Sequence, residues 1–289
     1  MRAMPSMDKK RIAGHWPSAV LGCGVLLLYL PAIREFLYDW SHDDNYSHGF
    51  LIPVISAYLL WQKRHEILSA KRESNLLGLF VLMSGLVLNI LGTAAAEWYT
   101  VRFSLILVLL GLVLYLWGRQ VLRYVWFPVA FIVFAIPLPY TLFRTLTFPM
   151  QLFSTKATYL IISHLGITAL RQGNLLHLPG YSLEVIEACS GLRSLIVLSA
   201  LAAVFAYLSS GTVLRKFFMF SLSVPIAIGA NIVRLLVVSL GALLISPAFA
   251  EGFLHEFSGV LVFMVGLTCF IMLNALFGKQ KVRCDTINV

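Results

Sequence analysis

Hydrophobic residues occur along the chain in long runs separated by short polar segments, which is the pattern of a membrane-embedded protein. Eight runs suit transmembrane helices, and they lie at residues 16–37, 48–62, 76–96, 101–118, 121–139, 190–209, 217–244 and 256–277. The second run is short and is expected to begin within the preceding NYSHG segment. The pattern therefore predicts an all-α polytopic membrane protein in which residues 1–289 form a single transmembrane domain.

The segments between these runs alternate in charge, and this alternation predicts their orientation. Basic residues precede the first run, follow the second, fourth and sixth, and end the chain: Lys9, Lys10, Arg11, Lys63, Arg64, Lys71, Arg72, Arg119, Arg123, Arg215, Lys216, Lys279, Lys281 and Arg283. Acidic residues follow the first, third and seventh runs: Glu35, Asp39, Asp43, Asp44, Glu97, Glu251 and Glu256. The positive-inside rule then places both termini in the cytoplasm. The basic N-terminus has no small-residue cleavage site after its apolar run, so we interpret that run as an uncleaved span.

Residues 140–188 differ from the rest of the chain. The part from 140 to about 173 contains Arg144, Lys156, Pro149 and several polar residues. It predicts a re-entrant or interfacial helical pair rather than two full spans. The following NLLHLPGYSLEVIEA segment has short alternating runs around a Pro-Gly turn, which predicts a small β-hairpin. The charge alternation is consistent only if this whole region begins and ends on the outer face.

Composition supports the membrane interpretation and excludes a more obvious use of the positive charge. The chain is 59% hydrophobic and 12% charged, with a mean hydropathy of +0.85. Its net charge of +9 does not indicate nucleic-acid binding, because the basic residues lie in short clusters between apolar runs and not on one patch.

Three reactive side chains from different runs are expected at the outer boundary of the membrane. Cys189 opens the sixth run, within LEVIEACSGLRSL. Arg234 lies roughly 25 Å beyond Lys216 along the seventh helix, close to the outer edge of a hydrocarbon core about 30 Å thick. His255 begins the eighth. Each residue has a structural interpretation by itself: cysteine as an apolar filler, arginine as a residue that reaches toward headgroups, and histidine as a hydrogen-bonded boundary residue.

The cysteine pattern favours a reactive role for Cys189. The other cysteines, Cys23, Cys269 and Cys284, are expected too far toward the cytoplasm to form a disulfide with it. An unpaired thiol would then face an oxidising compartment. A helix starting at CSGLRSL would favour the thiolate at its N-terminus, with Arg193 four residues on adding positive potential and Gly191 allowing close backbone approach. His255 could act as general base and acid, and Arg234 could stabilise an oxyanion, which suits acyl transfer from a peptide bond.

The motifs EACSGLRSL, ANIVRLL and GFLHEFSG together resemble the exosortase/archaeosortase family of membrane-embedded cysteine transpeptidases. The resemblance extends to DDNYSHGFLIP, IPLP, QLFSTKATYL and RQGNLLHLPG, in the expected order, and it is closer to the bacterial exosortases because His255 stands at the third catalytic position. A soluble C-terminal domain, which some exosortases carry, is not expected after the last run.

This resemblance implies a function and a set of site residues. Family members process exported proteins whose C-terminal sorting signal combines a Pro-Glu-Pro (PEP-CTERM) motif, a transmembrane helix and a basic tail, and they are associated with exopolysaccharide and biofilm systems. Cys189 would attack at the motif, with Arg234 and His255 as partners, on the periplasmic side of a bacterial inner membrane. The surrounding site residues would be Arg193, Glu187, Ser190, Gly191, Asn231 and His48.

Several alternatives stay open. Arg193 could be structural, holding the hairpin or Glu187, and His48 with Asp43 and Asp44 could line substrate access or cap the second helix. No cofactor is expected, and the spacing of Asp and His residues matches no familiar metal site. The main alternative function is a transporter or flippase for a glycan or lipid intermediate. A transporter would favour ionisable groups at mid-bilayer, whereas the ones in this sequence cluster at the outer edge.

Overall fold

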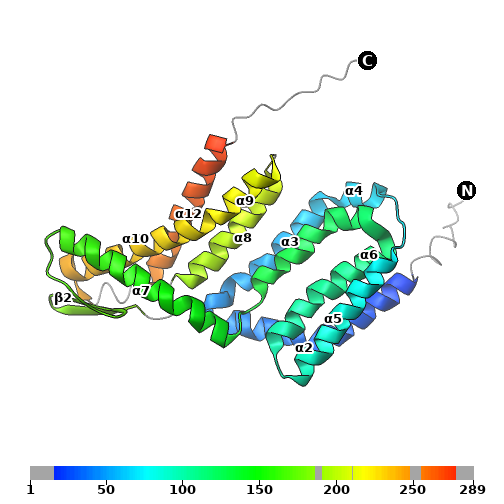
Figure 1. Ribbon diagram of the computed structural model, residues 1–289, viewed down its shortest axis with the longest axis horizontal. Helices are drawn as coiled ribbons and strands as arrows, with labels where there is room; N and C mark the ends of the chain where they lie inside the picture. The colour runs from blue at the N-terminus through cyan, green and yellow to red at the C-terminus, as the bar shows by residue number, and fades with distance from the viewer. Residues whose placement is uncertain (1–15, 186–190, 210, 248–254, 278–289) are drawn as a thin grey trace, which may run out of the picture. The chain divides into compact units, whose positions relative to one another are not determined.

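Helices dominate the computed structural model, which describes residues 16–185, 191–209, 211–247 and 255–277 (Figure 1). Cys189, Glu187 and Ser190 lie outside the described residues. The chain divides into two compact units, Met1–Pro137 and Leu138–Val289. The organisation of residues 1–289 as a single domain stays a prediction.

The first unit consists of helices. They are α2 (Trp16–His42), the 3₁₀ helix η1 (Asp44–Phe50), α3 (Leu51–Gln62), α4 (Arg64–Ser69), α5 (Leu76–Ala94), α6 (Trp98–Phe131) and the 3₁₀ helix η2 (Ile132–Ala135). Local capping explains two of the starts. The Asn75 side chain accepts a hydrogen bond from the Leu77 amide at 2.9 Å, and Glu97 accepts bonds from Tyr99 and Thr100 at 3.0 and 2.6 Å. Both residues satisfy amides that the first helical turn leaves unpaired.

Helices α5 and α6 pack closely because glycines line their contact. Gly78, Gly85 and Gly92 recur at every seventh residue of α5 and are buried. A Cβ atom at Gly85 would stand 2.8 Å from Val108 Cγ2, and one at Gly92 would stand 2.9 Å from Val101 Cγ2. Small residues at this spacing let two apolar helices approach through their backbones, which is the usual way helices associate in lipid.

Gly118 interrupts α6. Its backbone angles, φ 81° and ψ −173°, are not helical, and a Cβ atom there would collide with the carbonyl oxygen of Glu73. A glycine is required for both reasons. The break separates residues 98–117 from residues 119–131, at the boundary predicted between the fourth and fifth spans.

Four helices of the described chain are long and apolar enough to cross a membrane: Val20–His42, Leu76–Ala94, Trp98–Ala135 and Val213–Leu244. The prediction of eight spans is therefore not confirmed. Helix α3 has only 12 residues and α8, at Leu192–Leu208, has 17, so both are shorter than a typical crossing of about 20 residues. The predicted fourth run and most of the fifth, residues 121–135, fall within the single stretch Trp98–Ala135, which Gly118 interrupts. The chain is nevertheless a mostly helical membrane protein, as predicted.

The second unit combines helices with a sheet. Its elements are α7 (Tyr140–His164), β1 (Leu170–Gln172), β2 (Leu175–Leu178), β3 (Tyr181–Glu184), α8 (Leu192–Leu208), α9 (Val213–Ser221), α10 (Ser223–Leu244) and α12 (His255–Phe277).

The helical pair predicted between residues 140 and 173 is wrong in its number of helices. One helix of 25 residues, α7, occupies most of this region and contains Pro149 without ending there. The sequence interpretation gave that proline and the polar residues too much weight as helix breakers. Several of the polar residues lie on one buried face of α7 instead, whereas Arg144 and Lys156 are exposed.

The predicted hairpin is confirmed and belongs to a larger sheet. Strands β2 and β3 pair antiparallel with Leu178 opposite Tyr181, so Pro179 and Gly180 form a two-residue turn in which Gly180 has φ +73°. A further strand, β1, pairs antiparallel with β2 and completes the order β1-β2-β3. Gly173, with φ +63°, begins the turn between them. The third strand was not predicted, because β1 has only three residues.

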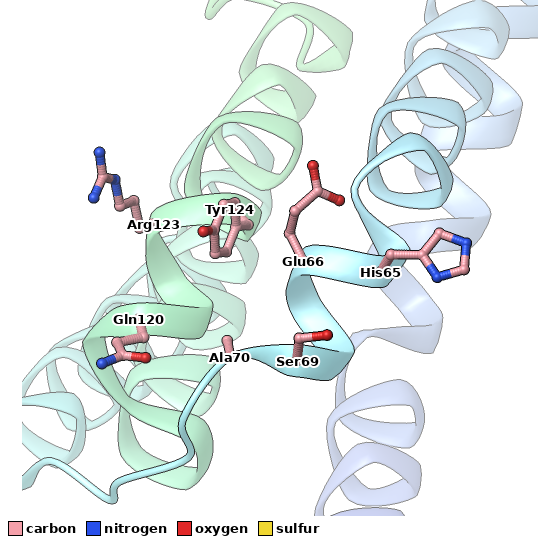
Figure 2. A pocket seen from close by; sticks show the side chains of 7 residues that line it. All are labelled: His65, Glu66, Ser69, Ala70, Gln120, Arg123 and Tyr124. Atoms are coloured by element: carbon pink, nitrogen blue, oxygen red, sulfur yellow. The ribbon is translucent and has the colours of Figure 1, made fainter. Parts of the chain in front are cut away.

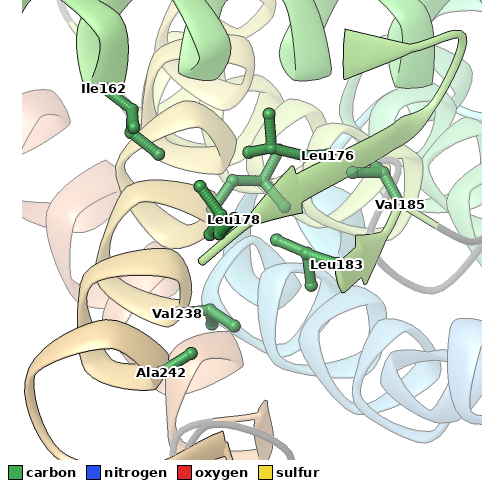
Figure 3. Packing of buried hydrophobic residues seen from close by; sticks show 8 residues of the cluster. Ile162, Leu176, Leu178, Leu183, Val185, Val238 and Ala242 are labelled. Atoms are coloured by element: carbon green, nitrogen blue, oxygen red, sulfur yellow. The ribbon is translucent and has the colours of Figure 1, made fainter. Parts of the chain in front are cut away.

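One face of this sheet packs on α7 and α10. Leu176, Leu178 and Leu183 point to that face and meet Ile162 of α7 and Val238 of α10 (Figure 3). Alternate residues point away: the His177 ring is hydrogen-bonded to the Ser182 hydroxyl across the strands, with 2.9 Å between Nδ1 and Oγ. The alternation fixes the register of the sheet, since a shift by one residue would expose the leucines.

Candidate functional site

Helix α10 carries two predicted site residues whose side chains are buried. Asn231 is 0% exposed and Arg234 is 8% exposed. They are three residues apart, so they lie about one turn from each other on one side of the helix. A buried arginine in an apolar helix must face other protein groups, because lipid cannot solvate its charge. Arg234 therefore has an environment suited to a functional role.

Asn231 connects α10 to α7. Its Nδ2 donates a hydrogen bond to Ser154 Oγ at 3.2 Å. Ser154 belongs to a buried polar face of α7 that sequence reasoning missed, formed by Thr147, Gln151, Ser154, Thr155 and Thr158. These residues recur at intervals of three or four, which is the period of one helical face. That spacing in the sequence could have revealed the buried polar face of α7.

Gly191 connects α10 to the segment that carries Cys189. Gly191 is the residue before α8, with φ 85° and ψ 0°. A Cβ atom on it would stand 2.8 Å from Asn231 Cγ. The residue two positions after Cys189 thus packs directly against the side chain of Asn231. The sequence suggested that this glycine lets a substrate approach, and the structure adds a second reason for it.

The predicted relation between Cys189 and Arg193 needs correction. An i, i+4 pair on one helical face requires continuous helix, whereas α8 begins only at Leu192 and Gly191 has left-handed backbone angles. Arg193 lies in the first turn of α8 and is exposed. Its exposure contrasts with the burial of Arg234, so the two arginines occupy different environments.

His255 is the first residue of α12, the same helix that contains Cys269. Helix α12 packs against both α10 and α8. The helix that begins at His255 therefore adjoins the helix that bears Arg234 and the helix that follows Gly191. Of the cysteines within the described residues, Cys23 and Cys269 are free thiols.

His48 belongs to the first unit, within η1. Its Nε2 lies 3.2 Å from the carbonyl oxygen of Phe134. The Asp43 side chain accepts a hydrogen bond from the Asn45 amide at 2.9 Å and caps η1. Asp43 is therefore a cap of η1, the 3₁₀ helix that leads into α3, whereas α3 itself begins without a side-chain cap.

The first unit also contains an open pocket of about 630 Å³ between α4 and the second half of α6. His65, Glu66, Ser69, Ala70, Gln120, Arg123 and Tyr124 line it. Glu66 and Tyr124 face the space between the helices, and the His65 ring points away from α6 (Figure 2). The Glu66 carboxylate is paired with Lys63 at 3.0 Å. Of the predicted site residues that the structure describes, none lines this pocket. Among the described residues no group of three His, Cys, Asp or Glu side chains is arranged to hold a metal ion.

The sequence comparison decides the family. The family model of the transmembrane exosortases matches residues 40–272. The chain belongs to the transmembrane exosortase family. The matched range includes η1 at its start and the Cys189, Arg234 and His255 positions of the second unit. Comparison with curated proteins and comparison with solved structures each found no match. Membership of the exosortases supports a transpeptidase or protease role in broad terms, acting on membrane proteins with sorting signals.

Proposed function

We propose that this exosortase is a cysteine transpeptidase that cuts the C-terminal Pro-Glu-Pro sorting signal of exported proteins through a thioacyl intermediate. Cys189 is the nucleophile, His255 the general acid and base, and Arg234 the stabiliser of the oxyanion. Glu187, Ser190, Gly191, Arg193 and Asn231 surround the reaction. The link to exopolysaccharide systems rests on the family resemblance alone.

The observation that carries this proposal is the contact between Gly191 and Asn231. Two residues of chain span at most about 7 Å, so Cys189 cannot lie far from Gly191. Asn231 holds Gly191 on one side and is one turn from the buried Arg234 on α10. The motif with the thiol and the helix with the guanidinium therefore belong to one packed region. This arrangement supports a site assembled from several helices.

The reaction follows from these groups. His255 takes the proton of the Cys189 thiol, and the thiolate sulfur attacks the scissile carbonyl carbon and forms a C–S bond. The carbonyl oxygen takes the negative charge beside Arg234. The C–N bond breaks as His255 gives a proton to the leaving amine. Water or an acceptor amine then attacks the thioester, loses a proton to His255, and releases the thiol. The buried position of Arg234 strengthens its effect on the oxyanion, since little solvent screens the charge.

The orientation proposed for the protein matches such a substrate. The basic connecting segments support an orientation with both termini in the cytoplasm and the Cys189 segment on the periplasmic side of the inner membrane. The basic tail of the substrate stays in the cytoplasm while its cleavage motif emerges on the outer face. A membrane-impermeant thiol reagent should label Cys189 from the periplasm. Protection of Cys189 in intact spheroplasts, with labelling only after lysis, would contradict this orientation.

The decisive experiment is co-expression with a reporter protein that carries the three-part signal and a tag on each side of the motif. We expect wild type to separate the tags, and Cys189→Ala to leave them joined with the protein still in the membrane. Cys23→Ala and Cys269→Ala are matched controls that remove a thiol elsewhere and should process normally. Mass spectrometry of the new C-terminus distinguishes hydrolysis from transfer. Unchanged processing by Cys189→Ala would refute the assignment.

Arg234→Lys and Arg193→Lys form a second matched pair. Lysine keeps the charge but lacks the planar fork of arginine donors. We expect Arg234→Lys to slow processing by about 100-fold, the loss typical of an oxyanion donor, and the exposed Arg193→Lys to slow it less than tenfold. Equal effects of the two substitutions would remove Arg234 from its proposed role.

A further inference from the structure

Strand β3 is an edge of the sheet, and its hydrogen-bonding pattern shows which main-chain groups face outward. The Val185 amide donates to the Asn174 carbonyl at 3.0 Å. In an antiparallel pair, directly opposed residues alternate between bonded and non-bonded pairs. Leu183 with Leu176 and Tyr181 with Leu178 are therefore the bonded pairs. The main-chain groups of Ser182 and Glu184 then point away from β2.

These outward groups are available for pairing. Ser182 and Glu184 are both exposed, and within the described part of the chain no hydrogen bond reaches their main-chain N–H or C=O groups. The inner face of the same strand is anchored, because Leu183 is buried against the cluster with Val238 (Figure 3). A rigid strand with an open edge is the arrangement that accepts an extended peptide as an additional strand.

The open edge closely precedes the proposed nucleophile in the sequence. The chain continues from Glu184 through Val185 to Cys189, only five residues later. We propose that the sorting-signal peptide is held as a fourth strand along β3, which aligns its scissile bond with Cys189. This inference rests on the proposed function, because the occupant is the substrate of that reaction. The ligand is an extended peptide recognised through its main chain.

The spacing of the residues in the Pro-Glu-Pro motif suits main-chain pairing with this edge. In a strand, alternate residues direct their N–H and C=O groups to the same side. The two prolines lack N–H groups, and both face away from β3 when the glutamate between them faces it. The central glutamate can then offer both of its main-chain groups to the edge, and the prolines occupy the outer side, where they are tolerated. The residue before a proline is also biased toward extended structure.

The first test changes the substrate. Full-length enzyme in lipid vesicles is given synthetic peptides with the motif, the transmembrane helix and the basic tail, each N-methylated at one amide. Methylation of the central glutamate, or of residues two positions away, should lower kcat/KM about three- to tenfold, as expected for one lost hydrogen bond. Methylation three positions away should have little effect. A fall in kcat/KM that does not follow this two-residue period would overturn the docking proposal.

The second test changes the enzyme. Ser182→Pro removes one outward N–H without touching a main-chain bond to β2, and Ser182→Ala is its control because both substitutions lose the hydroxyl that is hydrogen-bonded to His177. Arg171→Pro places a proline at the opposite edge of the sheet, where the register also directs the main chain outward. We expect only Ser182→Pro to raise KM, by about three- to tenfold, with the alkylation rate of Cys189 and the melting temperature unchanged.

The outcomes separate the two proposals. If wild type processes the unmodified peptide and Ser182→Pro retains the wild-type KM, the docking mode is wrong while the proposed function stands. If wild type fails to process the unmodified peptide, the proposed function itself is refuted. Equal increases in KM for Ser182→Pro and Arg171→Pro would indicate a general effect on the sheet and would also refute docking at β3.

Discussion

Gly191 lies directly against the side chain of Asn231, which leaves no space for a Cβ atom: one added at Gly191 would stand 2.8 Å from Asn231 Cγ. The residue that follows the reactive segment is thereby held to the helix that carries Arg234. The contact joins positions 40 residues apart in the sequence.

Gly191→Ala should impair both stability and processing. Its left-handed backbone costs an alanine about 1–2 kcal/mol, and the collision with Asn231 adds to that cost. Gly173→Ala is the matched control, since Gly173 has φ +63° and nothing within 4 Å of an added Cβ. Thermal unfolding in detergent and the reporter assay should show a larger loss for Gly191→Ala. Equal losses in the two variants would mean that the contact with Asn231 is unimportant.

Ser154→Ala should slow processing although Ser154 is not expected to touch the substrate. The substitution removes the 3.2 Å hydrogen bond to Asn231, worth about 0.5–1.5 kcal/mol, and we expect kcat to fall by a few-fold to tenfold with KM little changed. Ser154→Thr keeps a hydroxyl and should restore most of the rate. Thr145→Ala, on the exposed side of α7, removes a hydroxyl that bonds only within its own helix at 2.8 Å. A loss of rate in Thr145→Ala as large as that in Ser154→Ala would argue against positioning through Asn231.

We expect Glu97 to make the stability of the folded protein depend on pH. Burial raises the pKa of its carboxyl, but the hydrogen bonds from Thr100 and Tyr99, aided by Arg102, outweigh burial and leave the pKa below its usual value. A lowered folded-state pKa means that the stabilisation is complete above the unfolded value of about 4.3 and is lost as pH falls through the folded pKa. Glu97→Gln should lose about 0.5–2 kcal/mol at pH 7. Its melting temperature should also fall less than that of wild type between pH 5 and pH 3, measured in detergent. The same acid sensitivity in both proteins would exclude Glu97 as the source.

The Asp39–Arg102 ion pair should stabilise the first unit. Arg102 Nη2 lies 2.6 Å from Asp39 Oδ2, and the guanidinium side chain is 4% exposed. Its Cζ also lies 4.9 Å from the centre of the Phe36 ring. Asp39→Asn leaves this buried charge without its counter-ion, so we expect a loss of about 1–3 kcal/mol in unfolding free energy. Glu73→Gln breaks the exposed pair with Lys71 and should cost less than about 1 kcal/mol. Denaturant unfolding in micelles compares the two, and a similar cost for both would contradict this account.

Local patterns in the sequence determined much of the secondary structure. The third predicted run begins at residue 76, where α5 starts, because Asn75 caps it through a bond to a residue two positions away. The Pro179-Gly180 turn also depends on neighbouring residues, and the predicted hairpin is present around it. The family resemblance also depended on short motifs, and the family comparison confirms it. These features depend on neighbours in the chain, so the sequence alone contains their physical cause.

Tertiary structure decided the features that depend on residues far apart. The polar residues of α7 suggested a broken helix by themselves, but the fold buries several of them on one face of a continuous helix. Ser154 is hydrogen-bonded to Asn231, which lies 77 positions away in the sequence. Asp39 of α2 forms an ion pair with Arg102 of α6. The sequence by itself determined the membrane class and the family, because hydrophobic runs and motifs are properties of neighbouring residues, whereas the roles of Cys189, Arg234 and His255 stay predictions. Only the fold decided that Arg234 is buried and Arg193 exposed, because burial depends on which helices pack together.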